Sequence, residues 1–163
     1  MFEAVILMGG FGTRLKSISG DTPKPMVLVG GEPFVYKLMK NLEAAGCNKI
    51  VLSLYFRADY IIEKIKFDNP VSCTVCFVVE DEPLGTGGGI KLAASQINSE
   101  HFIAINGDTY CNISYGELYN QNSGFDLVIS GVNVNDISRY GSLELDSSLR
   151  ILALKEKGSS GPG

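Results

Sequence analysis

Nearly continuous apolar runs alternate along this chain with stretches that place apolar residues on one helical face. Runs of the first kind are typical of strands buried on both sides of a parallel sheet, and they occur at residues 2–8, 49–54, 74–80 and 102–106. The second kind predicts helices at residues 33–45, 58–67, 87–96 and 114–121. This alternation predicts an α/β fold, a Rossmann-like, mostly parallel sheet with helices on both faces.

The remaining segments predict extended structure. Residues 27–29 follow a pair of prolines and suit a short strand, and the apolar run at residues 125–132 predicts a further strand. Residues 140–145 and 149–155 flank a polar turn sequence, which predicts a C-terminal β-hairpin. We expect one domain over residues 1–163, because that length is sufficient for a single buried core.

Composition and charge restrict the function classes. With 45% hydrophobic and 20% charged residues, the chain is typical of soluble globular proteins. A formal net charge of −4 argues against a general nucleic-acid-binding protein, and no apolar run is long enough to span a membrane. The first residues lack the basic start of a signal peptide, so we expect a cytoplasmic protein. The sequence sets no oligomeric state and leaves a homo-oligomer open.

Cys73 and Cys76 have the spacing of a zinc-binding pair, but they belong to an apolar run that predicts a strand. Residues three apart on a strand point to opposite faces, so these two thiolates cannot share one zinc ion. We interpret the 4 cysteines as small apolar residues of a reduced protein. His101 is expected at the surface or at the edge of a strand.

The most informative segment follows the first strand. Gly9, Gly10 and Gly12 form a glycine-rich loop that ends in Thr13-Arg14, and Lys24 stands between two prolines a short distance further on. Backbone N–H groups of such a loop can close around an oxyanion, and arginine and lysine add formal positive charge. The segment therefore predicts a polyphosphate site at the end of the first strand.

Three known glycine-rich motifs do not fit this segment. A P-loop ends in Gly-Lys-Ser/Thr, whereas Gly12 is followed here by Thr13-Arg14. The dinucleotide fingerprint and the protein-kinase loop both require a third glycine where this chain has Leu15. An ordinary P-loop NTPase, a dinucleotide enzyme and a protein kinase are thereby disfavoured.

Two further clusters are expected beside this loop, because ligands of parallel sheets bind beyond the carboxyl ends of the strands. Asp108 follows the run at residues 102–106, and a carboxylate facing a phosphate site is a natural Mg²⁺ ligand. Glu80 opens a loop that leads to three consecutive glycines. We interpret this loop as the site of a flat base, because Glu80 can accept hydrogen bonds from the N–H groups of guanine and equally from the N–H of uracil.

Six motifs together resemble those of the sugar-1-phosphate nucleotidyltransferases, or nucleotide-sugar pyrophosphorylases. They follow the family's order over essentially the whole chain: residues 9–15, Pro23-Lys24-Pro25, Glu80 with residues 83–88, residues 106–108, residues 139–141 and Glu156-Lys157. The Glu-x-x-Pro-Leu-Gly-Thr-Gly-Gly pattern is most similar to the branch of D-glycero-D-manno-heptose 1-phosphate and mannose-1-phosphate guanylyltransferases.

The resemblance implies a reaction in which a sugar-1-phosphate attacks the α-phosphorus of an NTP, with GTP favoured, and gives an NDP-sugar and pyrophosphate. It implies Mg²⁺ as cofactor, Asp108 as its ligand, and Arg14, Lys24 and Asp108 as the catalytic residues. The implied nucleotide-binding residues are Met8, Gly9, Gly10, Gly12, Thr13, Arg14, Glu80, Pro83, Gly85 and Thr86. The implied sugar-phosphate-binding residues are Asn106, Gly141, Glu156 and Lys157.

Family domains continue past the Glu156-Lys157 motif into a strand that carries a second metal ligand. We therefore expect this chain to lack the usual C-terminal part, to bind Mg²⁺–NTP, and to form NDP-sugar slowly or not at all. A non-catalytic domain that binds a nucleotide or a nucleotide-sugar is the main alternative. A dinucleotide-dependent oxidoreductase is disfavoured by Leu15.

Overall fold

The structure is a computed structural model that describes residues 1–10, 20–121, 124–138 and 140–155. It divides into two compact units, Met1–Gly124 and Phe125–Gly163, and each unit is described by itself. No described helix has both the length and the apolar composition needed to cross a membrane.

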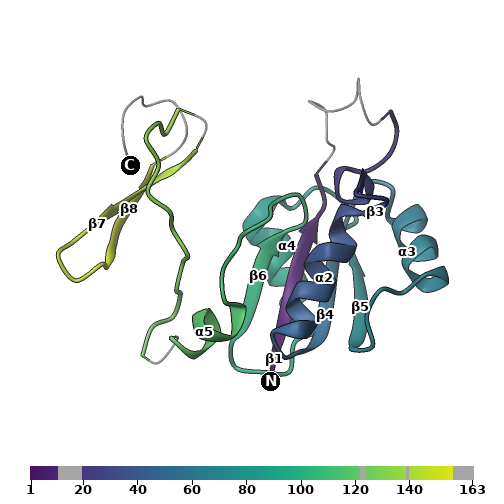
Figure 1. Ribbon diagram of the computed structural model, residues 1–163, viewed down its shortest axis with the longest axis horizontal. Helices are drawn as coiled ribbons and strands as arrows, with labels where there is room; N and C mark the ends of the chain where they lie inside the picture. Colours follow the sequence, from purple (N-terminus) through teal and green to yellow (C-terminus); the bar gives the residue numbers. More distant parts are fainter. Residues whose placement is uncertain (11–19, 122–123, 139, 156–163) are drawn as a thin grey trace. The chain divides into compact units, whose positions relative to one another are not determined.

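The first unit is built on a parallel sheet of four strands (Figure 1). Its strands are β1 (Phe2–Met8), β4 (Cys47–Leu54), β5 (Thr74–Val79) and β6 (Phe102–Asn106), in the order β5-β4-β1-β6. This arrangement confirms the predicted α/β fold, and the strands lie within two residues of the predicted runs. Because β4 and β6 pair with opposite sides of β1, the strand order reverses at β1, and ligands of such sheets bind at the reversal.

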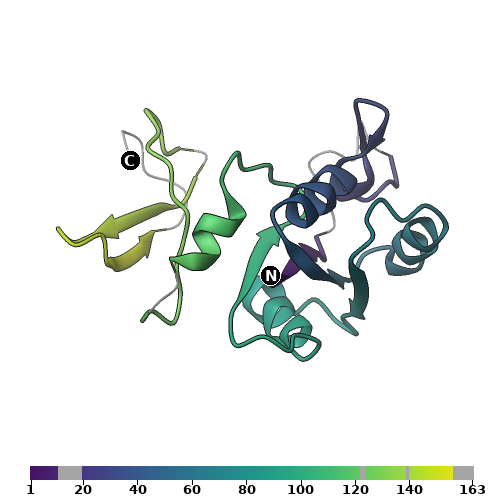
Figure 2. The same ribbon diagram turned by 60° about the horizontal axis from the view of Figure 1, so that its bottom comes forward.

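Helices cover both faces of this sheet (Figures 1 and 2). One face packs against α2 (Phe34–Ala44), α3 (Ala58–Phe67) and α5 (Tyr115–Asn120), and their buried residues join Ile6 and Leu52 in the main core. The other face packs against α4 (Gly85–Ala94), where Ala93 contacts the cluster of Val5 and Val51. The helix at residues 58–67 agrees with its prediction, whereas α4 begins and ends two residues earlier than predicted.

Three of the four cysteines follow the sequence interpretation, and Cys111 does not. Cys73 packs against the main core and Cys76 against the cluster on the opposite face, as expected from their spacing. Burial raises the pKa of the Cys47 thiol to about 11, so this thiol stays protonated at neutral pH. Cys111 is exposed and belongs to neither core cluster.

Short local structures mark the amino end of α5 and the segment before α2. The Ser114 hydroxyl accepts a hydrogen bond from the Glu117 N–H at 3.3 Å and so caps the amino end of α5. Residues 27–29 contribute β2 (Leu28–Val29), which pairs antiparallel with β3 (Glu32–Pro33). A short 3₁₀ helix, η2 (Lys24–Met26), precedes this ribbon.

The second unit contains the predicted hairpin, formed by β7 (Ser142–Leu145) and β8 (Ile151–Lys155). An ion pair of 2.8 Å between Glu144 and Lys155 joins its strands. The strand predicted at residues 125–132 is wrong. Within the described residues this segment pairs with no strand, and Leu127 and Val132 are exposed, because an apolar run becomes a strand only where another strand accepts its hydrogen bonds.

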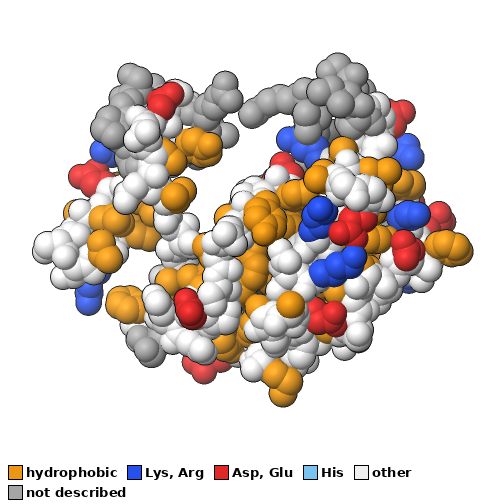
Figure 3. Space-filling view, in the orientation of Figure 1, with side chains coloured by type: hydrophobic (Ala, Val, Ile, Leu, Met, Phe, Trp, Pro, Cys, Tyr) orange, Lys and Arg blue, Asp and Glu red, His pale blue; other side chains and the backbone are white. Residues whose placement is uncertain are grey.

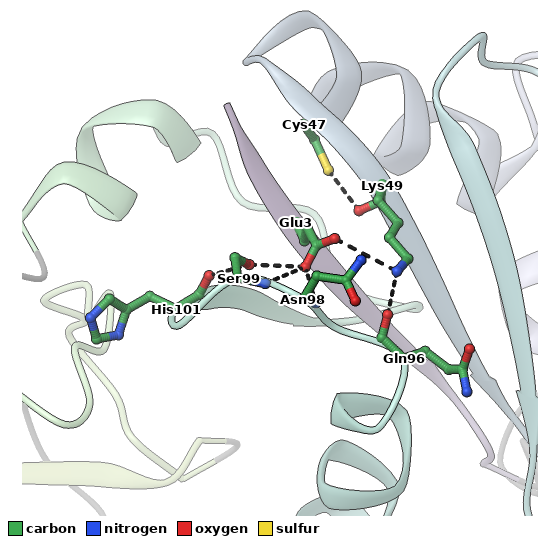
Figure 4. A network of polar contacts seen from close by, with 7 residues as sticks. All are labelled: Glu3, Cys47, Lys49, Gln96, Asn98, Ser99 and His101. Atoms are coloured by element: carbon green, nitrogen blue, oxygen red, sulfur yellow. Dashed lines mark hydrogen bonds and ion pairs between the residues drawn. The ribbon is translucent and has the colours of Figure 1, made fainter.

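A partly buried polar network around Glu3 joins the amino ends of β1 and β4 to the loop between α4 and β6 (Figure 4). Glu3 Oε2 accepts hydrogen bonds from the Asn98 N–H at 2.6 Å, the Ser99 N–H at 2.8 Å and the Ser99 hydroxyl at 3.0 Å. Lys49 Nζ lies 3.6 Å from Glu3 Oε1 and donates to the Gln96 carbonyl. The network fixes this loop against the sheet edge opposite the strands' carboxyl ends.

We expect Glu3→Gln to remove part of the acid sensitivity of folding. Burial by itself raises the pKa of Glu3, but the Ser99 and Asn98 N–H groups, the Ser99 hydroxyl and Lys49 outweigh it and lower the pKa below 4.5. Glu3 therefore stabilises the fold above about pH 4.5, and this contribution is lost as the pH falls toward the lowered value.

In urea unfolding near pH 7, Glu3→Gln should lower the free energy of unfolding by about 1–3 kcal/mol. The difference from wild type should shrink near pH 3. Glu100→Gln is the matched control, because the Glu100 side chain is 91% exposed. Equal effects of the two substitutions, or a pH-independent loss, would contradict the role of the network.

Candidate functional site

A pocket of about 350 Å³ opens in the first unit at the carboxyl edge of the sheet. It gathers ten residues that the sequence assigned to nucleotide, metal or sugar phosphate: Met8, Gly9, Gly10, Lys24, Glu80, Pro83, Gly85, Thr86, Asn106 and Asp108. Their contacts with a ligand remain predictions, but segments separated by up to a hundred residues do meet in one place. Leu7 and Pro25 also line this pocket.

The other predicted site residues are not part of this described pocket. Gly141 belongs to the second unit, directly before β7. The remaining ones lie outside the described residues: Gly12, Thr13, Arg14, Glu156 and Lys157.

The register of the strands explains why the loops that follow their carboxyl ends lie close together. Met8 pairs with Leu54, and Leu54 pairs with Val79, so the Gly9 loop and Glu80 begin at the same level of the sheet. On the other side of β1, the Gly107 N–H donates to the Leu7 carbonyl at 2.8 Å. A Cβ at Gly107 would lie 2.8 Å from Met8 Cγ, so only glycine permits this approach, which places Asp108 beside the pocket.

The predicted phosphate cation and the predicted metal ligand lie next to each other. Lys24 Nζ is 3.4 Å from Asp108 Oδ2, and the two side chains are 26% and 47% exposed. Lys24 begins η2, whose buried Pro25 and Met26 anchor it to the core. A partly exposed ion pair of this kind contributes little to stability, so a charged ligand can rearrange it at low cost.

Glu80 is buried, in contrast to the partly exposed pair of Lys24 and Asp108. The residue is 7% exposed, its Oε1 accepts a hydrogen bond from the Ser53 hydroxyl at 3.2 Å, and its Oε2 accepts one from the Leu84 N–H at 2.9 Å. A carboxylate has about four acceptor sites, so each oxygen retains capacity for a further donor. Ser53 was not predicted from the sequence, although a single hydroxyl in the run at residues 49–54 was an available signal.

Two of the three consecutive glycines have a packing reason. A Cβ at Gly88 would lie 2.6 Å from Leu84 Cβ, and one at Gly89 would lie 2.8 Å from Glu80 Oε1 and 3.2 Å from Ser53 Oγ. A Cβ at Gly87 would meet nothing within 4 Å. Gly89 therefore allows α4 to approach the Glu80 carboxylate, so packing accounts for part of the glycine run without a ligand.

We expect Gly89→Ala to destabilise the protein, because its methyl group must displace the buried Glu80 carboxylate or shift α4. Overpacking of this kind typically costs about 1–3 kcal/mol of unfolding free energy. Gly87→Ala is the matched control on the same helix, and it should be neutral or stabilising by up to about 1 kcal/mol. Thermal and urea unfolding measure both effects, and an equally tolerated Gly89→Ala would contradict the close packing around Glu80.

Charge on the surface is mixed in sign. The face drawn in Figure 3 carries lysine and arginine side chains beside aspartate and glutamate. In the described structure, Lys40 and Glu32 form an ion pair of 2.5 Å. A continuous basic surface, which nucleic-acid binding favours, does not occur on the described part of this face.

Comparisons with known proteins agree with this geometry. The family model described as "Nucleotidyl transferase" matches residues 3–162. D-glycero-alpha-D-manno-heptose 1-phosphate guanylyltransferase of Campylobacter jejuni is 34% identical over 155 residues, which are 95% of this chain and 68% of the relative. The crystal structure of HddC from Yersinia pseudotuberculosis superposes with a TM-score of 0.91 at 52% identity, over 100% of this chain and 72% of HddC.

A second crystal structure, of HddC complexed with GMP-PN, superposes with a TM-score of 0.90, at the same identity and coverage. The match to the family model extends over nearly the whole chain, and it includes every strand of the sheet that forms the pocket. The chain therefore belongs to the nucleotidyl transferase family.

Proposed function

We propose that this protein transfers GMP from GTP to a sugar-1-phosphate and releases pyrophosphate. The observation that carries the proposal is the convergence of Gly9, Lys24, Glu80 and Asp108 on one pocket at the point where the strand order reverses. A phosphate oxygen of the sugar-1-phosphate forms a bond to the α-phosphorus of GTP. The bond from that phosphorus to the bridging oxygen breaks, and its electron pair leaves with pyrophosphate, so the product is a GDP-sugar.

The phosphate end of the pocket suits this transfer, in which catalysis depends on positioning and charge neutralisation. Backbone groups of Gly9 and Gly10 approach the triphosphate, and Lys24 binds phosphate oxygens and holds the two reacting phosphates close together. Arg14, from the same glycine-rich loop, is proposed to stabilise the pyrophosphate leaving group. These roles are supported by the pocket positions of Gly9, Gly10 and Lys24.

The donor set also fits Mg²⁺. Asp108 offers a half-exposed carboxylate, and Mg²⁺ is usually bound through one or two carboxylates together with substrate phosphates. Bound there, Mg²⁺ would neutralise charge on the triphosphate as the transition state forms. Asp108 is at present paired with Lys24, so we propose that Lys24 turns to the phosphates when Asp108 takes the metal.

The base end of the pocket favours guanine. Guanine presents two adjacent donors, N1–H and the 2-amino group, which match the two oxygens of the Glu80 carboxylate. Uracil presents a single N–H between two carbonyl oxygens, and these would repel the carboxylate. The similarity to HddC, at 52% identity, supports this preference because that protein was crystallised with GMP-PN. We also propose a cytoplasmic location, where GTP and sugar phosphates are available.

We expect pyrophosphate release that requires both GTP and a sugar-1-phosphate, and we expect this release to be slow in this chain, as the sequence predicts. The test is a panel of GTP, ATP, UTP and CTP against heptose-, mannose- and glucose-1-phosphates, with nucleotide affinity measured in parallel by calorimetry. GTP should bind at least about tenfold more tightly than UTP, because the wrong base leaves buried acceptors unpaired. Saturable GTP binding with a complete absence of pyrophosphate release, rather than slow release, would instead favour a non-catalytic nucleotide-binding domain, and preferential NAD(P) binding would contradict both assignments.

Asp108→Asn should uncouple Mg²⁺ from nucleotide binding, because the amide keeps the shape of the carboxylate but loses its charge. We expect the increase in GTP affinity caused by Mg²⁺ to fall by about tenfold or more. Calorimetry with and without Mg²⁺ measures this increase directly. Asp81→Asn is the control, because Asp81 is exposed and does not line the pocket. If Asp108→Asn responds to Mg²⁺ as wild type does, the metal ligand lies elsewhere.

A further inference from the structure

Ser53 is the polar residue in the middle of an otherwise apolar segment. It lies in β4 between Leu52 and Leu54, and all three residues are 0% exposed. A hydroxyl that is fully removed from water needs a hydrogen-bond partner inside the protein. Its side chain shares a face of the sheet with Val51, the face that α4 covers. Ser53 therefore lies between the central sheet and the helix that begins at the pocket.

The Ser53 hydroxyl has two acceptors within reach and one proton to donate. Glu80 Oε1 is 3.2 Å away, and the Gly89 carbonyl oxygen is 3.4 Å away. A carboxylate is the stronger acceptor, because hydrogen bonds to a charged group are about twice as strong as those between neutral groups. The closer and charged partner, Glu80, therefore accepts the hydrogen bond from the Ser53 hydroxyl.

The Glu80 carboxylate is enclosed by several segments of the first unit. Its Oε1 lies 3.3 Å from the position of a Cβ at Gly9 and 2.8 Å from that of a Cβ at Gly89, while its Oε2 is held by the Leu84 N–H. Among the described residues, no cation forms an ion pair with Glu80. A buried carboxylate in such a place depends on hydrogen-bond donors for its orientation, and the Ser53 hydroxyl is the donor to Oε1.

We infer that Ser53 is a positioning residue for base selection: its hydroxyl holds Glu80 Oε1 so that the carboxylate presents both oxygens to guanine. The inference rests on the proposed function, because it assigns Glu80 to the guanine base. Ser53 does not line the pocket, so it acts through Glu80 and not by touching the nucleotide. Lys24 and Asp108 come from other elements, so the phosphate end does not depend on Ser53.

Ser53→Ala tests this inference through base discrimination rather than through activity. Calorimetry of wild type and variant with GTP and with UTP gives the ratio of the two affinities. We expect Ser53→Ala to weaken GTP binding by about tenfold, the usual effect of leaving a buried acceptor without its donor, and to leave UTP binding nearly unchanged. The ratio of GTP affinity to UTP affinity should therefore also fall by about tenfold.

Two further variants separate positioning from general damage. Ser53→Cys keeps a weak donor of similar size, so its ratio should fall between those of wild type and Ser53→Ala. Val51→Ala removes buried volume from the same face of the same strand, so it should lower the unfolding free energy and keep the ratio. If Ser53→Ala does not fold, the comparison of Ser53→Cys with wild type decides alone.

The outcomes distinguish this inference from the function on which it rests. A wild type that does not prefer GTP overturns the proposed function itself. A wild type that prefers GTP, together with unchanged ratios in Ser53→Ala and Ser53→Cys, overturns the inference and leaves the proposed function standing. An equal loss of the ratio in Val51→Ala also overturns it, because the hydroxyl would then have no special role.

Discussion

The register of β1 between β4 and β6 is the constraint on which the rest of the first unit depends. Met8, Leu54 and Val79 stand in one row across three parallel strands, and the Gly107 N–H reaches the Leu7 carbonyl on the other side. A shift of one residue would turn every side chain to the opposite face, and the two core clusters forbid this. The loops that follow the strands therefore begin at one edge of the sheet, and the pocket is a consequence of that edge.

The two ends of the pocket handle charge in different ways. At the phosphate end, Lys24 and Asp108 are partly exposed and pair with each other, and Asp108 also accepts a hydrogen bond from the Thr109 hydroxyl, so their arrangement changes at little cost. At the base end, Glu80 is buried and fixed by Ser53 and Leu84. A site that neutralises a flexible triphosphate benefits from adjustable charges, whereas a site that reads hydrogen bonds on a rigid base benefits from groups fixed before binding.

Glycines of the first unit serve close packing of the site as well as access for a ligand. Gly107 lets β6 approach the end of β1, and Gly89 lets α4 approach the Glu80 carboxylate. Neither glycine has a positive φ. Each is required because a Cβ at its position would collide with a side chain or a carbonyl oxygen of another segment. A glycine-rich sequence beside a predicted site thus reflects packing of the site as well as the approach of a ligand.

The resemblance of six motifs to a known family implied ten residues that meet in the pocket, and they meet because the ends of parallel strands share an edge. The sequence alone also predicts the α/β class, the parallel strands and most helices, because burial and periodicity are local properties of the chain. It did not determine whether residues 125–132 form a strand, since pairing depends on a partner elsewhere in the chain. Nor did it reveal the links of Glu80 to Ser53 and of Lys24 to Asp108. These contacts become visible in the folded structure, because each joins residues far apart in sequence, and the distance between them depends on the packing of whole elements.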